Sequence, residues 1–327
     1  MLGRQRGVID VGRALGAVPP AAGAAAMASG IVSVALHLAG IEWFSIFWLV
    51  IGVVIWTMLV GIFFARLIGD RARWVGEADT PAALTAVAAT TVLGTRVALL
   101  GGDTIAVVAL GVAVIVWVVL MPAVISYWTG PTAGAYFLLC VATEGLAVLG
   151  ATLAVELPAP GLTAVAVAVS VLGLIAYGLV LSRFSFAQFK TGAGDQWVCT
   201  GALAISGLAA GRLITATESA GWSGWPTTAI RIAAIVIVVL DLTGYLALAV
   251  CEVRWPRPGF DIRRWSTAFP MGMTAAATIT VGTAIGQPWL RTVGLVLIWP
   301  AVAVCLILLI ASARQLVSAG AADTSSG

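Results

Sequence analysis

Long apolar stretches recur along the whole chain, and they decide what the chain can fold into. They lie near residues 18–38, 43–65, 80–100, 103–125, 131–155, 160–182, 192–214, 227–250, 266–286 and 289–312. Because about 20 apolar residues in a helix are enough to cross a bilayer, the pattern predicts ten transmembrane helices. Only 9% of the 327 residues are charged, whereas soluble domains have roughly 25%. A surface with so little charge must face lipid, so we expect an all-α integral membrane protein.

The remaining segments are too short to form a soluble domain. We expect a cytoplasmic N-terminal tail at residues 1–17, a ten-helix transporter or channel domain at 18–313 and a disordered C-terminal tail at 314–327. The net charge of +3 comes from scattered basic residues, which argues against a nucleic-acid partner, because nucleic acids bind to a basic stripe. One histidine and four separate cysteines provide no ligand cluster, so we expect neither a metal nor another cofactor.

The distribution of basic residues predicts the orientation in the membrane. With the N-terminus inside, thirteen of the 17 Lys and Arg residues fall on the cytoplasmic side. The outer side keeps Arg96, Arg212, Arg231 and Arg291. Because basic residues concentrate on the cytoplasmic side of membrane proteins, ten crossings with both termini in the cytoplasm fit best. Few lysines beside many arginines and alanines point to a bacterial source, and hence to the plasma membrane.

Odd-numbered and even-numbered segments differ in composition. Even segments are bulky, as in WFSIFWLVIGVVIWTMLVGIFF, whereas odd segments are rich in Ala, Gly, Ser and Thr, as in VAATTVLGT. Small residues let helices approach closely inside a membrane. The odd segments are therefore expected inside the bundle, with the even ones between them and the lipid.

A hydroxyl residue recurs in the odd segments, with a small residue four positions after it. The five hydroxyl residues are Ser29, Thr90, Thr143, Ser206 and Thr278. Repeats of about 60 residues indicate five helical hairpins, which suggests a pseudo-five-fold arrangement around a central pore. Residues four apart share a helix face, so we expect these five hydroxyl groups to line that pore.

Two of the odd segments resemble a known family. MASGIVSVALHLAG (27–40) is similar to the first-helix signature of the tellurite-resistance/C4-dicarboxylate transporter family, and RRWSTAFPMGMTAAA (263–277) is similar to its ninth-helix signature. That family includes bacterial tellurite-resistance channels, yeast malate and sulfite transporters, and the slow anion channels of plant guard cells. The resemblance implies one pore in each protomer and a homotrimer. It also implies small-anion substrates: C4-dicarboxylates such as malate, or chloride, nitrate, sulfite and tellurite.

An aromatic residue followed by a proline is a candidate gate. In the family that this chain resembles, such a pair on the ninth helix plugs the pore, which places the plug at Phe269 and Pro270. Proline removes a backbone donor and kinks a helix, and a ring at a narrow point blocks a pore sterically or by dewetting. The plain alternative is a phenylalanine packed near the cytoplasmic end of its helix.

Two acidic residues lie deep in the apolar segments, where a carboxylate is costly and marks a functional site by default. Glu144 is either a proton-coupling or pore-lining residue, or a structural residue that is neutral or paired. It lies about 100° around the helix from Thr143. Asp241 lies in an even segment, and we expect it to make a structural hydrogen bond, either to an inner helix or to a neighbouring protomer.

Arg96 and Arg212 occupy matching places in two repeats, six residues after Thr90 and Ser206. Arginines at a pore favour anions, so these two are candidates for an anion-attracting mouth. The alternative is that both extend to lipid headgroups. His37, the only histidine, is expected to be interfacial or packed.

These features favour membrane transport of small anions over other functions. A proton-coupled dicarboxylate carrier that uses Glu144 is an alternative. An integral membrane enzyme is much less favoured, because it needs several catalytic groups at one depth and the sequence has no H-E-x-x-H or P-loop motif. A membrane sensor would normally carry a soluble output domain. We therefore do not expect an enzyme, and the expected partners are small anions, membrane lipid and further copies of the chain.

Overall fold

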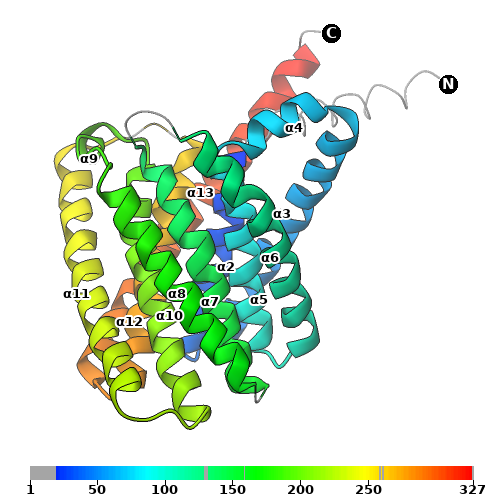
Figure 1. Cartoon of the computed structure of the whole chain (residues 1–327). Coiled ribbons are helices and arrows are strands. Elements are labelled where there is room, and N and C mark those ends of the chain that lie inside the picture. The colour runs from blue at the N-terminus through cyan, green and yellow to red at the C-terminus, as the bar shows by residue number, and fades with distance from the viewer. Residues whose placement is uncertain (1–19, 129–131, 158, 258, 260, 326–327) are drawn as a thin grey trace.

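The computed structural model describes residues 20–128, 132–157, 159–257, 259 and 261–325, and the predicted tail at 1–17 lies outside them. Each of the ten predicted segments coincides with one long helix (Figure 1). These helices are α2 (Gly23–Leu38), α3 (Glu42–Gly69), α5 (Thr85–Ala98), α6 (Asp103–Ser126), α7 (Leu138–Glu156), α8 (Pro160–Leu181), α10 (Val198–Ser219), α11 (Trp225–Arg254), α12 (Trp265–Ala284) and α13 (Pro288–Ser325). Eight helices of the described part are long and apolar enough to cross a membrane. The chain is therefore an all-α, multi-pass membrane protein, while the number of ten crossings stays a prediction.

Three helices depart from the expected pattern. A short helix, α4 (Arg71–Ala78), follows α3, and the Asp70 carboxylate caps it by accepting the Arg73 N–H at 3.1 Å. The last helix, α13, continues to Ser325, through most of the segment expected to be a disordered tail. That segment has several alanines and no proline, and alanine is the strongest helix former, so no residue in it stops the helix. A four-residue helix, α9 (Gln188–Thr191), lies between α8 and α10.

The long helices form two layers. The inner layer consists of α2, α5, α7, α10 and α12, whose side chains are mostly buried. In the most apolar 18-residue stretch of the segment that includes α7, 94% of the residues are buried, whereas in the corresponding stretch of α3 only 22% are buried. The outer helices α3, α6, α8, α11 and α13 expose many large apolar side chains, which suits a surface that faces lipid. The division between small-residue and bulky segments thus corresponds to burial.

The inner helices form a closed ring. Contacts join α2 to α5, α5 to α7, α7 to α10 and α10 to α12, and α12 returns to α2. Each outer helix packs on the inner helix before it and also touches the next one around the ring, so that α3 covers α2 and α5, and α13 covers α12 and α2. Every junction between inner helices is therefore covered from outside.

A short 3-10 turn precedes every inner helix. The five turns are η1 (Pro20–Ala22), η2 (Pro81–Leu84), η3 (Gly134–Phe137), η4 (Asp195–Trp197) and η5 (Ile262–Arg264). Turn η1 contacts η2 and η5, η2 contacts η3, and η3 contacts η4. The far part of α13 lies at the same end, because Trp265 Nε1 donates to Ser312 Oγ at 3.2 Å. Figure 1 shows the end of α13 and the start of α2 at this end of the bundle.

At the opposite end, four of the five inner helices finish in the same glycine turn. Gly40, Gly101, Gly221 and Gly286 follow α2, α5, α10 and α12 with φ of 80°, 80°, 74° and 70°. At each of them the residue after the glycine donates its N–H to the carbonyl five residues back, as Ile41 does to Leu36 at 2.9 Å. Glycine is favoured there because it adopts the left-handed conformation without strain. The turn sends the chain straight into the next outer helix.

Turns η3 and η4 meet through a glycine. A Cβ on Gly134 would lie 2.2 Å from the carbonyl oxygen of Asp195. That oxygen belongs to the backbone, so it cannot rotate away as the end of a side chain can.

The Gly134→Ala variant should therefore be less stable by roughly 1–3 kcal/mol, because the two turns must separate to admit the methyl group. Gly61→Ala on α3 is the matched control, since nothing lies within 4 Å of its Cβ position and alanine favours a helix. Thermal unfolding in detergent measures both. Melting temperatures that agree between the two variants would contradict the close contact between η3 and η4.

Candidate functional site

A small cavity lies where all five inner helices meet. Its lining comes from α2, α5, α7, α10 and α12, namely Ile31, Val34, Thr91, Val92, Thr95, Gly145, Val148, Ile205, Leu208 and Met273. Its volume is about 10 Å³, which is close to the least that holds one water molecule. The axis of the ring is therefore nearly filled by side chains at this level.

Phe269 lies one turn from this cavity. It precedes Met273, which lines the cavity, by four residues, so the two share a face of α12 and Phe269 lies nearer to η5. Met27 has the same relation to the cavity-lining Ile31 on the neighbouring helix α2. Phe269 and Met27 are each 1% exposed. Two bulky side chains thus come from the cavity-facing sides of α12 and α2, at the level between the cavity and the ring of turns.

Pro270 faces a neighbouring inner helix. A Cβ on Gly201 of α10 would lie 2.7 Å from Cγ of Pro270, so the glycine provides the space that the proline ring occupies. Helix α12 continues through Pro270 from Trp265 to Ala284. The proline cannot donate to the Ser266 carbonyl four residues back. The pair therefore has one member on the cavity side of α12 and the other packed on α10.

Two of the five predicted hydroxyl groups face the outer helices. Thr90 Oγ1 accepts a hydrogen bond from Trp56 Nε1 of α3 at 2.8 Å. Thr143 Oγ1 accepts one from Trp117 Nε1 of α6 at 3.0 Å. In each pair the tryptophan of one hairpin donates to the inner helix of the next. These bonds hold adjacent hairpins together.

The other three predicted hydroxyl groups have different surroundings. Ser29 lies against α3, where a Cβ on Gly52 would be 3.4 Å from its Cβ. Ser206 Oγ donates to Glu144 Oε1 at 3.0 Å, and Thr278 Oγ1 donates to the Thr274 carbonyl at 2.6 Å. The structure therefore does not gather the five hydroxyl groups around the cavity, and their predicted pore-lining role stays a prediction.

Sequence reasoning missed the two hydroxyl groups that do line the cavity, Thr91 and Thr95. Thr91 packs so closely on α7 that a Cβ on Gly145 would lie 2.4 Å from its Oγ1. Both hydroxyls donate to carbonyls of their own helix, Thr91 to Ala88 at 3.0 Å and Thr95 to Thr91 at 2.8 Å. The available signal was the spacing of four between Thr91 and Thr95, which places both on one face.

Glu144 lies between helices, outside the cavity lining. It is fully buried, and its two carboxylate oxygens accept hydrogen bonds from Ser170 of α8 at 2.9 Å and from Ser206 of α10 at 3.0 Å. A Cβ on Gly173 would lie 2.6 Å from Glu144 Cγ. The carboxyl group therefore joins α7, α8 and α10, although its neighbour Gly145 lines the cavity.

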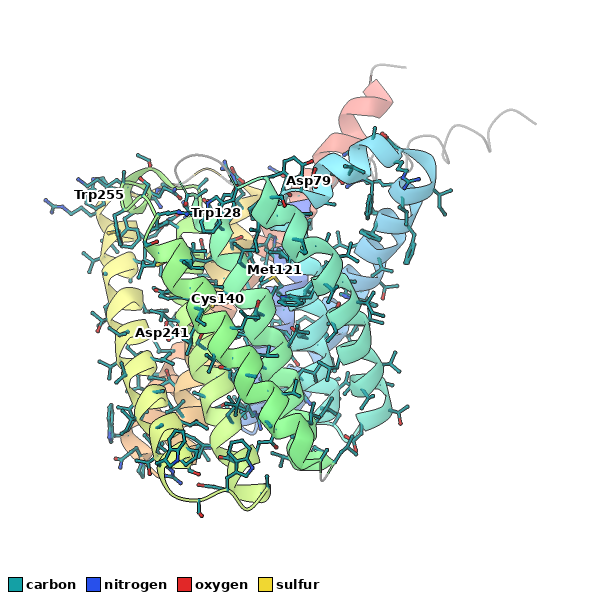
Figure 2. The ribbon with its side chains drawn as sticks, viewed as in Figure 1. Asp79, Met121, Trp128, Cys140, Asp241 and Trp255 are labelled. Carbon is teal, nitrogen blue, oxygen red and sulfur yellow. The ribbon has the colours of Figure 1, made fainter. Side chains whose placement is uncertain are left out.

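Asp241 makes a similar bond at the next junction of the ring. It lies at mid-height on α11 (Figure 2) and is fully buried. Its Oδ1 accepts a hydrogen bond from Thr274 Oγ1 of α12 at 3.0 Å. Hydroxyl groups thus donate to both oxygens of Glu144 and to one oxygen of Asp241, which lowers the cost of burying them. Oδ2 of Asp241 has no hydrogen-bond partner among the described residues.

Arg96 is buried and paired. Its side chain is fully buried, and it donates through Nε to Ser45 Oγ at 2.9 Å and through Nη2 to Glu42. Both partners belong to α3, so the guanidinium extends outward from α5. The same Glu42 carboxylate also contacts His37 Nδ1 at 2.7 Å. Glu42 thus balances the charge of Arg96.

Arg212 differs from Arg96 in its surroundings. It follows the cavity-lining Leu208 by four residues, so it lies on the same face of α10, one turn farther from the ring of 3-10 turns. Its Nε and Nη2 atoms are buried and have no hydrogen-bond partner among the described residues. Glu156 at the end of α7 interacts with it electrostatically. Arg212 is thus the arginine whose position and free donors suit an anion on the axis.

Known proteins provide the remaining comparison. The model of the SLAC1 family, described as voltage-dependent anion channel, matches residues 17–313. A search of curated proteins finds no match. The family match spans all ten long helices as far as residue 313, and it confirms the resemblance that 27–40 and 263–277 indicated. The chain belongs to the family of voltage-dependent anion channels, and its function is anion transport across a membrane.

Proposed function

We propose that small anions cross the membrane along the axis of the inner ring and that Phe269 closes this path. One observation carries the proposal: residues of all five inner helices line a cavity of about 10 Å³, and Phe269 lies one turn away on the cavity-facing side of α12. A path this narrow is closed, and movement of the Phe269 phenyl group away from the axis is the simplest way to open it.

The membrane arrangement that supports this path has ten crossings and a pseudo-five-fold ring. Five 3-10 turns before the inner helices and four glycine turns after them favour five equivalent hairpins. The excess of basic residues at the end that carries the 3-10 turns favours a cytoplasmic position for that end and for both termini. We further propose one pore in each protomer of a homotrimer in a bacterial plasma membrane. The exposed apolar side chains of the outer helices suit contacts with lipid and with other copies.

Inorganic anions such as chloride and nitrate are the substrates that this site favours. Among the described residues, the donors that we assign to this path are Arg212 and the two hydroxyl groups that line the cavity, Thr91 and Thr95. Arg212 is one cation, and Glu156 already interacts with it, so it can balance at most one negative charge, whereas a C4-dicarboxylate such as malate carries two. Malate therefore ranks behind monovalent anions. The hydroxyl groups must turn from their own carbonyls to donate to a passing anion.

Replacement of the Phe269 side chain by a methyl group should open the path. In proteoliposomes, Phe269→Ala should raise chloride flux by roughly tenfold or more, because the variant removes the side chain that blocks the axis. Phe137→Ala is the matched control: Phe137 is also fully buried, but it packs on Tyr177 and Phe184 away from the axis. Flux through Phe269→Ala that stays at the wild-type level would exclude Phe269 as the gate.

Removal of the Arg212 charge should lower the rate of anion transport. Arg212→Gln should lower chloride flux by roughly threefold to tenfold when it is measured in the open Phe269→Ala background, because a positive group near a pore concentrates anions. Arg96→Gln should have a smaller effect, since Glu42 already balances that charge. The two variants are compared by the initial rate of chloride efflux. A larger loss with Arg96→Gln than with Arg212→Gln would reverse the assignment.

A proton-coupled dicarboxylate carrier is the second candidate, and the position of Glu144 beside Gly145 of the cavity lining is the observation that favours it. In such a carrier, malate uptake would rise with an inward proton gradient, and Glu144→Gln would abolish that rise. For the channel, we expect flux that is independent of the proton gradient in both proteins. Measurements of malate and chloride uptake with and without a gradient separate the two functions.

A further inference from the structure

A second cavity, of about 430 Å³, opens on the outside of the bundle between α11, α12 and α13. Most of its wall is apolar, with Ala249 from α11 and Val304, Ile307 and Leu308 from α13. The cavity is far larger than the one on the axis, and its apolar wall is continuous with the outer face of the bundle. Its shape and chemistry suit a hydrocarbon chain.

Charged side chains occupy one side of this cavity. Arg257 donates to Glu252 at 3.0 Å and to the Phe189 carbonyl at 2.7 Å. Arg264 donates to the same Glu252 carboxylate and to the Arg257 carbonyl at 2.7 Å. Two guanidinium groups thus share one carboxylate, so the cluster keeps one positive charge. The Arg257 and Arg264 side chains are only 18% and 12% exposed, and a positive charge held this far from water attracts an anion strongly.

The next acidic group, Asp261, is bound mainly to an arginine outside the cluster. Asp261 is paired with Arg263 by hydrogen bonds of 2.7 to 3.2 Å. The Arg263 guanidinium lowers the pKa of the Asp261 carboxyl, so this pair stays ionised and neutral as a whole. Arg264 also lowers the pKa of the Asp261 carboxyl, as the smallest of the contributions. Asp261 therefore offsets the excess charge of the Arg257–Arg264–Glu252 cluster only in part, which leaves that charge for a further anionic partner.

The cluster lies at the level of the membrane interface. Trp255 lies at the end of α11, and Figure 2 shows it at the same end of the bundle as Trp128. The Lys190 ammonium lies over the Trp255 ring, 5.3 Å from the ring centroid, in a cation–π contact. Tryptophan and lysine near helix ends mark the headgroup region of a bilayer. A ligand in this cavity would thus have its charged part among headgroups and its apolar part in the hydrocarbon.

We propose that an anionic phospholipid binds here, with its phosphate at Arg257 and Arg264 and one acyl chain along α13. Paired arginines bind phosphate oxygens well, and basic pockets between transmembrane helices bind anionic headgroups. A zwitterionic phospholipid brings its own cation to a cluster that is already positive. Free phosphate cannot use the apolar wall.

The first hairpin repeats the arrangement. Arg66 and Arg73 share the Glu77 carboxylate at 2.7 and 2.9 Å, beside an apolar cavity of about 410 Å³ between α3, α5 and α6. This cavity also lies at the end of the bundle that carries the 3-10 turns, since η2 residues line it. Two arginines that share one glutamate beside a lateral cavity thus occur at two junctions of the ring.

Bound lipid would act on the gate, an effect that rests on the proposed function. Thr267 and Met271 line the lipid cavity, and they lie two residues before and after Phe269. Two residues correspond to about 200° around a helix, so both side chains lie on the back of the turn that carries Phe269. An acyl chain against Met271 stabilises this turn, and with it the closed position of the ring.

The binding test uses the full chain in detergent, titrated with phosphatidylglycerol or phosphatidylcholine and observed by native mass spectrometry. We expect phosphatidylglycerol to bind more tightly than phosphatidylcholine. The double variant Arg257→Gln/Arg264→Gln should weaken that binding roughly tenfold, because each arginine near the headgroup region contributes to anionic-lipid affinity. The Lys/Lys double variant, which keeps the charge, should retain most of it. Arg231→Gln is the control, because Arg231 is paired with Glu218 at the other end of α11.

Three results would overturn the lipid site: equal binding of the two lipids, unchanged binding in a Gln/Gln variant that melts at the wild-type temperature, or displacement of the lipid by free glycerol phosphate at equal concentration. Chloride flux tests the effect on the gate separately. Phosphatidylglycerol should lower flux in wild-type liposomes, and Met271→Ala should bind the lipid and lose this effect. Lipid binding without any change in flux would refute the effect on the gate and leave the binding site in place. Because the binding measurement needs no transport, it stands even if Phe269 is not the gate.

Discussion

Close approach between the backbones of the inner helices is the constraint on which the rest of the structure depends. Lipid gives helices little hydrophobic reason to associate, so they are held by packing. A Cβ on Gly23 would lie 2.1 Å from Thr85 Oγ1, and similar contacts join Gly145 to Thr91. The ring of inner helices can close because these contacts have glycine, which has no side chain, on one of the two helices. Thin helices also leave so little space on the axis that a few apolar side chains fill it.

The same packing determines where polar groups can lie. The deep carboxyl groups of Glu144 and Asp241 lie at junctions between helices, where hydroxyl groups donate to both oxygens of Glu144 and to Oδ1 of Asp241. On the axis, the lining consists of apolar side chains and of hydroxyls bonded to their own helix. A protein that conducts anions gains from this separation, because a carboxylate on the path would repel them. The arginines differ as well, since Glu42 of α3 is paired with Arg96, whereas Nε and Nη2 of Arg212 have no hydrogen-bond partner among the described residues.

Much of the fold follows from the sequence, and much of the site does not. The long apolar stretches predicted the ten long helices, and the alternation of small-residue and bulky segments predicted the two layers, because a lipid surrounding leaves few other arrangements. The rotation of each helix about its axis is harder to predict. Thr90 and Thr91 are adjacent and point about 100° apart around α5, so that Thr90 accepts a hydrogen bond from Trp56 of α3 while Thr91 lines the cavity. Arg96 and Arg212 occupy equivalent positions in the sequence, but only Arg96 has an acid opposite it on α3. Such differences depend on neighbouring helices that are remote in the chain.

The glycine turns at the tips of the hairpins have a consequence for how the protein is assembled. Their hydrogen bonds join residues at most five apart, so each pair of helices can take shape as soon as it leaves the ribosome. Closure of the circle is different, because α2 must meet α12, and some 230 residues of chain separate them. Without the final hairpin, the circle lacks the contacts of α12 with α2 and α10, so a truncated chain would leave the ring open on one side.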